Sequence, residues 1–92
     1  MIIQTTLHFK KAAKKFPAKQ KQHIEDIIEK IGKKPEIGDL KKGDLAGVYV
    51  YKFKIHHQLM LLAYTYQKSG KHEALTLLSL STHENFYRDL KR

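Results

Sequence analysis

Apolar side chains recur at helical spacing in the first third of the chain. Each of two stripes holds four apolar residues spaced i, i+3, i+4 and i+7, namely Phe9, Ala12, Ala13 and Phe16, then Ile24, Ile27, Ile28 and Ile31. This spacing is typical of one face of an amphipathic helix. Pro17 separates the stripes, because proline ends one helix and suits the first turn of the next. The pattern predicts a helical hairpin over roughly residues 5–16 and 18–32, after a very short strand at residues 2–4.

The pattern changes after a glycine-rich loop at residues 35–47. Runs rich in β-branched and aromatic residues then predict three strands, at residues 48–55, 58–67 and 73–81. Between the last two runs, the segment Lys-Ser-Gly-Lys at residues 68–71 is typical of a hairpin turn. A short helix capped by Thr82 is expected over residues 83–91.

This order of elements, β-α-α-β-β-β with a short C-terminal helix, predicts one α+β domain over residues 1–92. A helical hairpin followed by a strand meander packs on one face of a small antiparallel sheet. The chain has 92 residues, of which 41% are apolar, enough for a modest core. It has no cysteine for a disulfide or a cysteine-based zinc site. No apolar run approaches the ~20 residues of a membrane span, and the N-terminus lacks a signal-peptide pattern, so we expect a cytoplasmic protein with no membrane partner.

The charge is strongly positive and unevenly distributed. Eighteen Lys and Arg residues against nine Asp and Glu residues give a net charge of +9, which indicates a polyanionic partner, either nucleic acid or an acidic protein. Residues 10–21 contain no acid and six lysines, which are Lys10, Lys11, Lys14, Lys15, Lys19 and Lys21. We expect these lysines on the outer face of the helical hairpin, where they bind RNA phosphates without selecting sequence.

Side chains alternate across the strand predicted at residues 48–55. Tyr49, Tyr51, Phe53 and Ile55 share the face that we expect to lie against the helices, and Val48, Val50, Lys52 and Lys54 share the other. Lys52 and Lys54 are thus neighbours on the open face of a strand that we expect to be central. They are either ordinary solvated lysines or a cationic floor for a phosphate, and alternation alone favours the ordinary interpretation.

The chain has six histidines, but none has the helical spacing with a glutamate that a zinc site of a metalloprotease needs, so we expect no metal and no cofactor. His56 and His57 are adjacent and consistent with a turn. His83 and Tyr87 fall one turn apart on the predicted terminal helix, and Arg88 follows. These three are either surface and packing residues or an imidazole, a phenol and a guanidinium gathered at one site.

Several of these segments resemble one protein family. Tyr-Lys-Phe-Lys-Ile at residues 51–55 resembles the Tyr-Lys-Ile-Lys-Leu stretch of RelE-type toxins, and residues 43–48 resemble the loop that enters that strand. His83-x-x-x-Tyr87 resembles the end of YafQ-like members. With the order of elements, the resemblance to the RelE/ParE superfamily covers nearly the whole chain. Leu61 stands where RelE-like members often carry an arginine on the middle strand, and Ser-Thr-His-Glu at residues 81–84 replaces their basic run.

The resemblance implies a toxin of a bacterial type II toxin–antitoxin system, held inactive in a complex with a co-encoded antitoxin. RelE-like members cut mRNA in the ribosomal A site and so inhibit translation. ParE-like members share the fold but inhibit DNA gyrase without nuclease chemistry, and a basic RNA-binding module without chemistry is a third alternative. Because Lys52, Lys54, His83 and Tyr87 are retained, we expect the ribonuclease, with the ribosome and mRNA as partners and the lysines of residues 10–21 on ribosomal RNA.

Metal-free RNA cleavage uses the ribose 2′-hydroxyl as internal nucleophile and needs a proton acceptor, a proton donor and cations around the phosphate. Imidazole titrates near neutrality, so His83 is the expected general acid or base. Lys52 and Lys54 would neutralise the charge of the transition state, or one of them would act as the base. Tyr87 would stack on a base or orient the phosphate, and Arg88 would add a bidentate phosphate contact.

Overall fold

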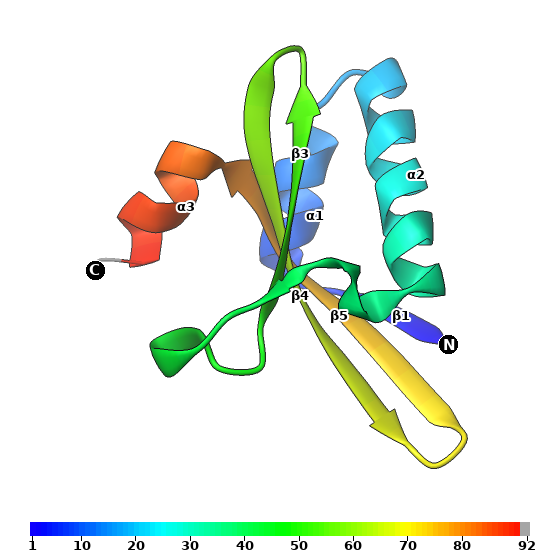
Figure 1. The fold of residues 1–92 in the computed structure, drawn as a ribbon. Helices are drawn as coiled ribbons and strands as arrows, with labels where there is room; N and C mark the ends of the chain where they lie inside the picture. Colours follow the sequence, from blue (N-terminus) through cyan, green and yellow to red (C-terminus); the bar gives the residue numbers. More distant parts are fainter. Residues whose placement is uncertain (91–92) are drawn as a thin grey trace.

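The computed structural model describes the backbone of residues 1–90 and the side chains of residues 1–86. Its strands are β1 (Ile2–Thr5), β2 (Asp39–Leu40), β3 (Tyr49–Ile55), β4 (Gln58–Ser69) and β5 (His72–Thr82). Its helices are α1 (Leu7–Lys14), α2 (Ala18–Lys33) and α3 (His83–Leu90), with short 3₁₀ turns at η1 (Pro35–Ile37) and η2 (Gly43–Leu45). Helices α1 and α2 cover one face of the sheet and α3 lies on the other (Figure 1). The predicted α+β architecture is confirmed.

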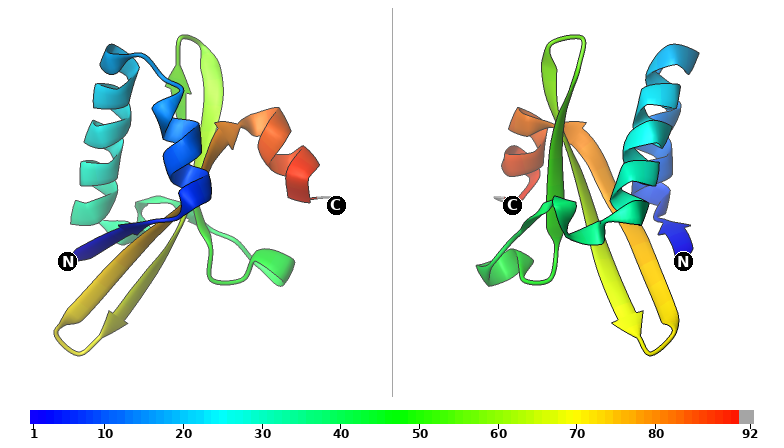
Figure 2. Two further views of the ribbon diagram at one scale, coloured as in Figure 1. Left: turned by 180° about the vertical axis from the view of Figure 1, so that it is seen from behind. Right: turned by 45° about the vertical axis from the view of Figure 1, so that its right-hand side comes forward.

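The sheet has the strand order β1-β5-β4-β3-β2, with β1 parallel to β5 and every other pair antiparallel. The central strand is therefore β4, and our expectation that the strand at residues 48–55 is central was wrong. Two features of the sheet were not visible in the sequence pattern. The N-terminal strand β1 pairs with the outer side of β5, and β2 has only two residues, too few to show a period of two. Figure 2 shows the long β4–β5 hairpin extending beyond the helices.

The helical hairpin is anchored by its apolar stripes and by one capping residue. The Thr6 hydroxyl accepts a hydrogen bond from the Phe9 backbone N–H at 3.1 Å and donates one to the Leu78 carbonyl oxygen at 2.8 Å. This side chain therefore caps α1 and ties it to β5. Both predicted stripes belong to the larger hydrophobic core, in which Phe9, Ile24, Ile27 and Ile31 are fully buried. No helix within residues 1–90 is long and apolar enough to cross a membrane.

The face assignment of β3 is confirmed, but the burial of its aromatic residues is less than we expected. Tyr49, Tyr51 and Phe53 pack against the larger core on the helical side, while Lys52 and Lys54 are exposed on the opposite side. The three aromatic side chains are only half-buried. This follows from the topology, because β2 covers the outer edge of β3 at only two positions.

The buried hydroxyl of Tyr64, on the central strand, holds the chain between α2 and β3. The side chain is 0% exposed, and its hydroxyl donates to the Pro35 carbonyl oxygen at 2.6 Å and accepts from the Gly38 backbone N–H at 3.0 Å. A Cβ atom on Gly38 would lie 2.6 Å from the same hydroxyl, so only glycine fits there. Burial raises the pKa of Tyr64 above its ordinary value of 10.0, although the Gly38 hydrogen bond lowers it in part.

Removing the Tyr64 hydroxyl should destabilise the fold. We expect Tyr64→Phe to lower the free energy of unfolding by about 1–3 kcal/mol, because the buried Pro35 carbonyl and the partly buried Gly38 N–H lose their partner. Gly38→Ala should also be destabilising, by about 1–3 kcal/mol, because its methyl group overlaps the hydroxyl. Urea unfolding of each variant measures the change.

Tyr51→Phe is the matched control, because the Tyr51 side chain is half-buried and its hydroxyl makes no hydrogen bond within residues 1–86. Since the folded state holds the Tyr64 proton more tightly than the unfolded chain, the resulting stabilisation is complete below pH 10.0 and is lost as the pH rises further. The Tyr64→Phe variant should lack that loss. Equal stability of Tyr64→Phe and Tyr51→Phe would contradict the role of the buried hydroxyl.

Candidate functional site

Lys52 and Lys54 lie on the face of the sheet opposite α1 and α2. In the register of β3 and β4, Lys52 pairs with Leu61 and Lys54 pairs with Leu59. Both lysines are exposed, whereas Leu61, which lies beside Lys52 on the neighbouring strand and on the same face, is 0% exposed. The two lysines therefore lie next to a buried apolar side chain on this face of the sheet.

His83 begins α3, which lies on the same face of the sheet as the two lysines. The last register pair of β4 and β5 joins Met60 to Thr82, the residue before His83, and Met60 also pairs with Phe53, the residue before Lys54. Neighbouring strands lie about 4.8 Å apart, so the backbones of Phe53 and Thr82 are separated by roughly 10 Å across β4. Lys54 and His83 each directly follow one of these two residues.

The start of α3 is held by a cap and by a buried aromatic side chain. The Thr82 hydroxyl accepts a hydrogen bond from the Asn85 backbone N–H at 3.2 Å, which confirms the predicted cap. Phe86 is 7% exposed and packs with Val50, Leu61 and Ala63 in a second hydrophobic cluster. This cluster seats α3 on the face that carries the two lysines.

Leu61 is one of the positions at which the chain departs from the RelE pattern. This side chain, which stands where RelE-like members often carry an arginine, is buried in the second cluster. Leu61 therefore supplies packing for α3 on the face that carries the lysines, and no charge. Across β4 from the lysines, the candidate functional side chain is the half-buried His83 at the start of α3.

Two of the predicted site residues lie beyond the described side chains. The backbone of α3 places Tyr87 one turn after His83, as the i, i+4 spacing predicts. The side chains of Tyr87 and Arg88 lie outside the described residues. The roles of His83, Lys52, Lys54, Tyr87 and Arg88 remain predictions.

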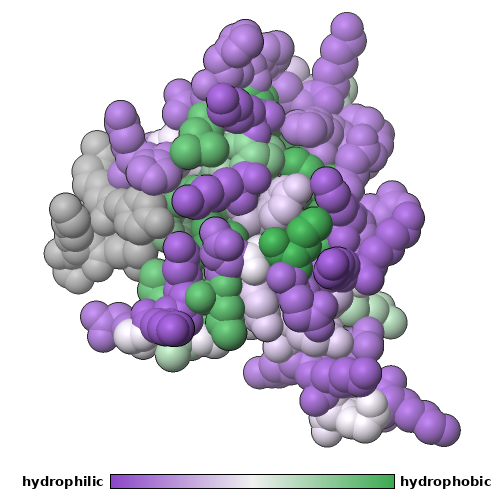
Figure 3. All heavy atoms as spheres, in the orientation of Figure 1, coloured by the Kyte–Doolittle hydropathy of each residue, from purple (hydrophilic) through white to green (hydrophobic). Residues whose placement is uncertain are grey.

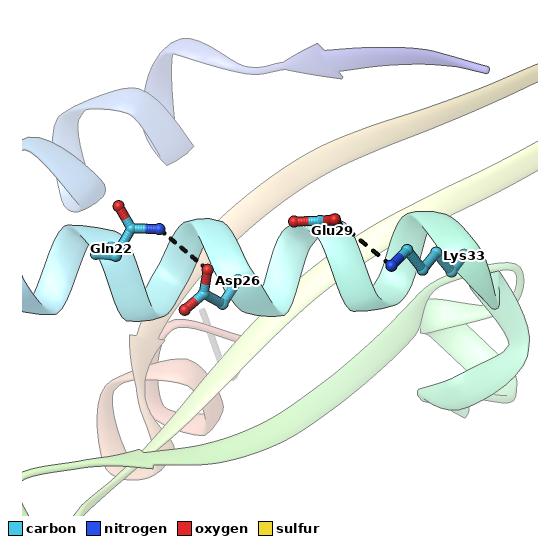
Figure 4. Close-up of polar contacts among 4 residues, drawn as sticks. All are labelled: Gln22, Asp26, Glu29 and Lys33. Carbon is cyan, nitrogen blue, oxygen red and sulfur yellow. Dashed lines mark hydrogen bonds and ion pairs between the residues drawn. The ribbon is translucent and has the colours of Figure 1, made fainter.

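The six lysines of residues 10–21, which we call the hairpin lysines, form a separate cationic surface. All six are exposed, and they occupy the hairpin on the face opposite Lys52 and Lys54. Farther along α2, polar side chains pair with one another instead (Figure 4). Gln22 donates to Asp26 at 3.0 Å, and the Lys33 ammonium lies 3.5 Å from the Glu29 carboxylate. Positive charge is thus concentrated on α1 and on the first turn of α2.

An apolar groove of about 400 Å³ lies between α1 and α2. The side chains that line it include Phe9, Ala13, Ile24 and Ile28 among the apolar ones and Lys10, Lys14, Lys21 and Glu25 among the charged ones. The sequence pattern did not indicate this groove. The two amphipathic stripes indicated that the helices share a core, but a stripe does not show where two helices diverge.

The turn between β3 and β4 has an unusual conformation. His56 and His57 form a two-residue loop and have positive φ angles of 48° and 68°. Both side chains are exposed. The expected turn at these two residues is therefore confirmed.

Hydrophilic side chains cover most of the molecular face drawn in Figure 3, and apolar side chains lie near its centre.

Comparisons with known proteins agree with this fold. The family model described as "ParE-like toxin of type II bacterial toxin-antitoxin system" matches residues 3–91. A YoeB/ParE toxin from Agrobacterium tumefaciens has a similar structure, with a TM-score of 0.73 and 22% sequence identity over 90% of this chain and 99% of that one. No curated protein matches the chain in sequence.

Two structures from E. coli are also similar. The intact RelBE toxin–antitoxin complex matches with a TM-score of 0.66 and 14% identity over 87% of this chain and 93% of that one. The isolated RelE toxin matches with a TM-score of 0.65 and 15% identity over 99% of this chain and 96% of that one. At these identities the three structures show a shared fold.

The separation of the two cationic surfaces leads to a test of the hairpin lysines. We expect the triple variant Lys11→Gln/Lys15→Gln/Lys19→Gln to bind ribosomes more weakly, because these exposed side chains would neutralise RNA phosphates. The slope of log K against log salt should become shallower by up to roughly 0.7–0.9 for each phosphate contact removed. Binding measured across a salt series gives this slope.

The matched control is Lys34→Gln/Lys42→Gln/Lys71→Gln, which removes the same charge from exposed lysines elsewhere. If both triple variants change the slope equally, the effect comes from net charge and the hairpin surface has no special role.

Proposed function

We propose that this chain, which belongs to the ParE-like toxins of type II bacterial toxin–antitoxin systems, is a metal-independent endoribonuclease that cuts mRNA on the ribosome and thereby inhibits translation. The observation that carries the proposal is the arrangement of Lys52, Lys54 and the start of α3 on one face of the sheet. The toxin acts in the cytoplasm, where its ribosomal target is found.

The proposed reaction is an internal displacement at one phosphate. The 2′-oxygen of the ribose forms a bond to phosphorus as the bond from phosphorus to the 5′-oxygen breaks, which leaves a 2′,3′-cyclic phosphate and a 5′-hydroxyl. One protein group accepts the proton of the 2′-hydroxyl and another supplies a proton to the 5′-oxygen. His83 serves as one of these groups, and the chemistry requires no metal ion.

Lys52 and Lys54 place positive charge next to the negative charge that develops on the phosphate in the transition state. The phosphate gains negative charge as the fifth oxygen approaches, so two ammonium groups stabilise the transition state more than the ground state. Their position beside the buried cluster of Val50, Leu61 and Phe86 supports this role, because a phosphate bound against that cluster would be less exposed to water on one side. Tyr87 and Arg88 act beside His83, as a stacking or orienting group and a phosphate ligand.

A second candidate function is inhibition of DNA gyrase without nuclease activity. Two observations favour it. The matching family model is ParE-like, and Leu61 is buried where RelE-like members often carry an arginine. The two functions predict different damage in cells, because a ribonuclease leaves mRNA cut at ribosomes and a gyrase inhibitor leaves broken DNA.

We further propose that the antitoxin places an acidic amphipathic helix in the groove between α1 and α2. The fold similarity to a toxin bound in a toxin–antitoxin complex supports a protein partner. The groove combines an apolar floor with three lysines among the residues that line it, which suits a helix with an apolar face flanked by Glu and Asp. RNA alone would not use the apolar floor.

The catalytic proposal is tested by replacing His83. We expect His83→Ala to reduce cleavage of ribosome-bound mRNA by about 10²–10⁴-fold, the usual contribution of a general acid or base. Ribosome binding and the circular dichroism spectrum should be unchanged. Lys54→Ala and Tyr87→Ala should also slow cleavage, with a smaller effect expected for Lys52→Ala.

His72→Ala is the matched control, because His72 is an exposed histidine at the far end of β5. Cleavage by His83→Ala at the wild-type rate would remove the histidine from the mechanism. Full toxicity after replacement of Lys52, Lys54, His83 and Tyr87 together would support the gyrase alternative.

The antitoxin proposal is tested by charge reversal at the groove. We expect Lys10→Glu/Lys14→Glu/Lys21→Glu to weaken antitoxin binding by roughly tenfold or more, because like charges would then face each other across the interface. The control reverses Lys11, Lys15 and Lys19, which lie on the same hairpin outside the groove. Equal losses in both variants, measured by calorimetry, would place the antitoxin elsewhere.

A further inference from the structure

The β3–β4 turn has a conformation that its sequence does not favour. Ile55 pairs with Gln58, so the loop consists of His56 and His57 alone, and both have φ angles in the left-handed region. A two-residue loop with this geometry favours Asn-Gly, because glycine adopts a positive φ without steric strain. Two bulkier side chains there are strained, although histidine tolerates the region better than most residues.

Packing does not account for the two histidines. Both side chains are exposed, and neither belongs to a hydrophobic cluster. Pairing of β3 with β4 needs only the backbone of the turn, which Asn-Gly would provide with less strain. The contacts within the described residues thus give no reason for two imidazole rings at this turn.

The turn directly follows the strand that carries the two lysines. β3 ends at Ile55, so Lys54 lies two residues before His56, and two residues of strand span about 7 Å. The same end of the molecule also carries the connection between α1 and α2, as the views in Figures 1 and 2 agree. Lys14 and Lys15 lie in this region, so a polyanion that reaches the turn meets cations on both sides.

We propose that the His56–His57 turn is a base-stacking subsite for a nucleotide next to the phosphate that is cut. This inference rests on the proposed ribonuclease function. A phosphate held over Lys52 and Lys54 places the neighbouring nucleotide of the same strand near the turn. Unpaired bases in single-stranded RNA stack on aromatic side chains, histidine included, and the flat rings of the turn are open to them. The subsite positions the strand and takes no part in proton transfer.

The test compares the natural turn with two replacements. His56→Asn/His57→Gly keeps the hairpin and removes both rings, whereas His56→Tyr/His57→Tyr keeps two aromatic rings without imidazole. The probe is a short single-stranded RNA with 2′-O-methyl riboses, which is not cleaved by attack of the 2′-oxygen. Binding is measured by fluorescence anisotropy, and the melting temperature reports the strain in the turn.

We expect the Asn-Gly variant to bind the RNA about 5–100-fold more weakly, the usual range for loss of a stacked base. Its melting temperature should rise by about 4–8 °C, as the strain is relieved. The Tyr-Tyr variant should retain most of the binding. Unchanged binding by the Asn-Gly variant, or equal losses in both variants, would overturn the subsite.

This experiment separates the inference from the function on which it rests. If the wild-type toxin cuts ribosome-bound mRNA and the Asn-Gly variant cuts and binds equally well, the subsite is wrong and the ribonuclease stands. If the wild-type toxin cuts no mRNA but loses RNA binding on the Asn-Gly change, the ribonuclease is wrong and the turn still contacts RNA.

Discussion

Burial of the central strand on both of its faces is the constraint on which the rest of the molecule depends. Residues 60–64 of β4 are buried without interruption. Met60, Leu62 and Tyr64 face the larger core beneath α1 and α2, whereas Leu61 and Ala63 face the smaller cluster closed by Phe86. A strand buried in this way needs a cover on each side, and the two covers differ. The helical hairpin covers one face, and α3 covers the face that also carries Lys52 and Lys54.

The two covers give the protein two cationic surfaces with different chemistry. The hairpin lysines are numerous, exposed and free of nearby acids between residues 10 and 21, which suits a surface that binds polyanions. Lys52 and Lys54 lie on the sheet face that also carries α3 and the second hydrophobic cluster, where we propose that one phosphate is cut. In the proposed complex, an antitoxin helix between α1 and α2 would cover Lys10, Lys14 and Lys21 and leave the face of Lys52 and Lys54 open.

The sequence predicted the elements well because their signals are local. The stripes of α1 and α2, the alternation of β3 and the Thr82 cap each depend on a few neighbouring residues. The central position of β4 was missed because it depends on β1 pairing with β5, more than 70 residues away. The Tyr64 hydrogen bonds to Pro35 and Gly38 were missed for the same reason. Lys52, Lys54 and His83 were predicted from alternation and resemblance, and only the register shows that Lys54 and the start of α3 lie on either side of β4.

The most direct test of the central claim is cleavage of two ribosome-bound mRNAs that differ in one atom. One carries ribose throughout, and the other carries a single 2′-deoxyribose at the site that the toxin cuts. We expect cleavage of the first message only, with a 2′,3′-cyclic phosphate on the upstream fragment, because the 2′-oxygen is the nucleophile. Cleavage of the deoxy message at the same position, or no cleavage of either message, would contradict the account.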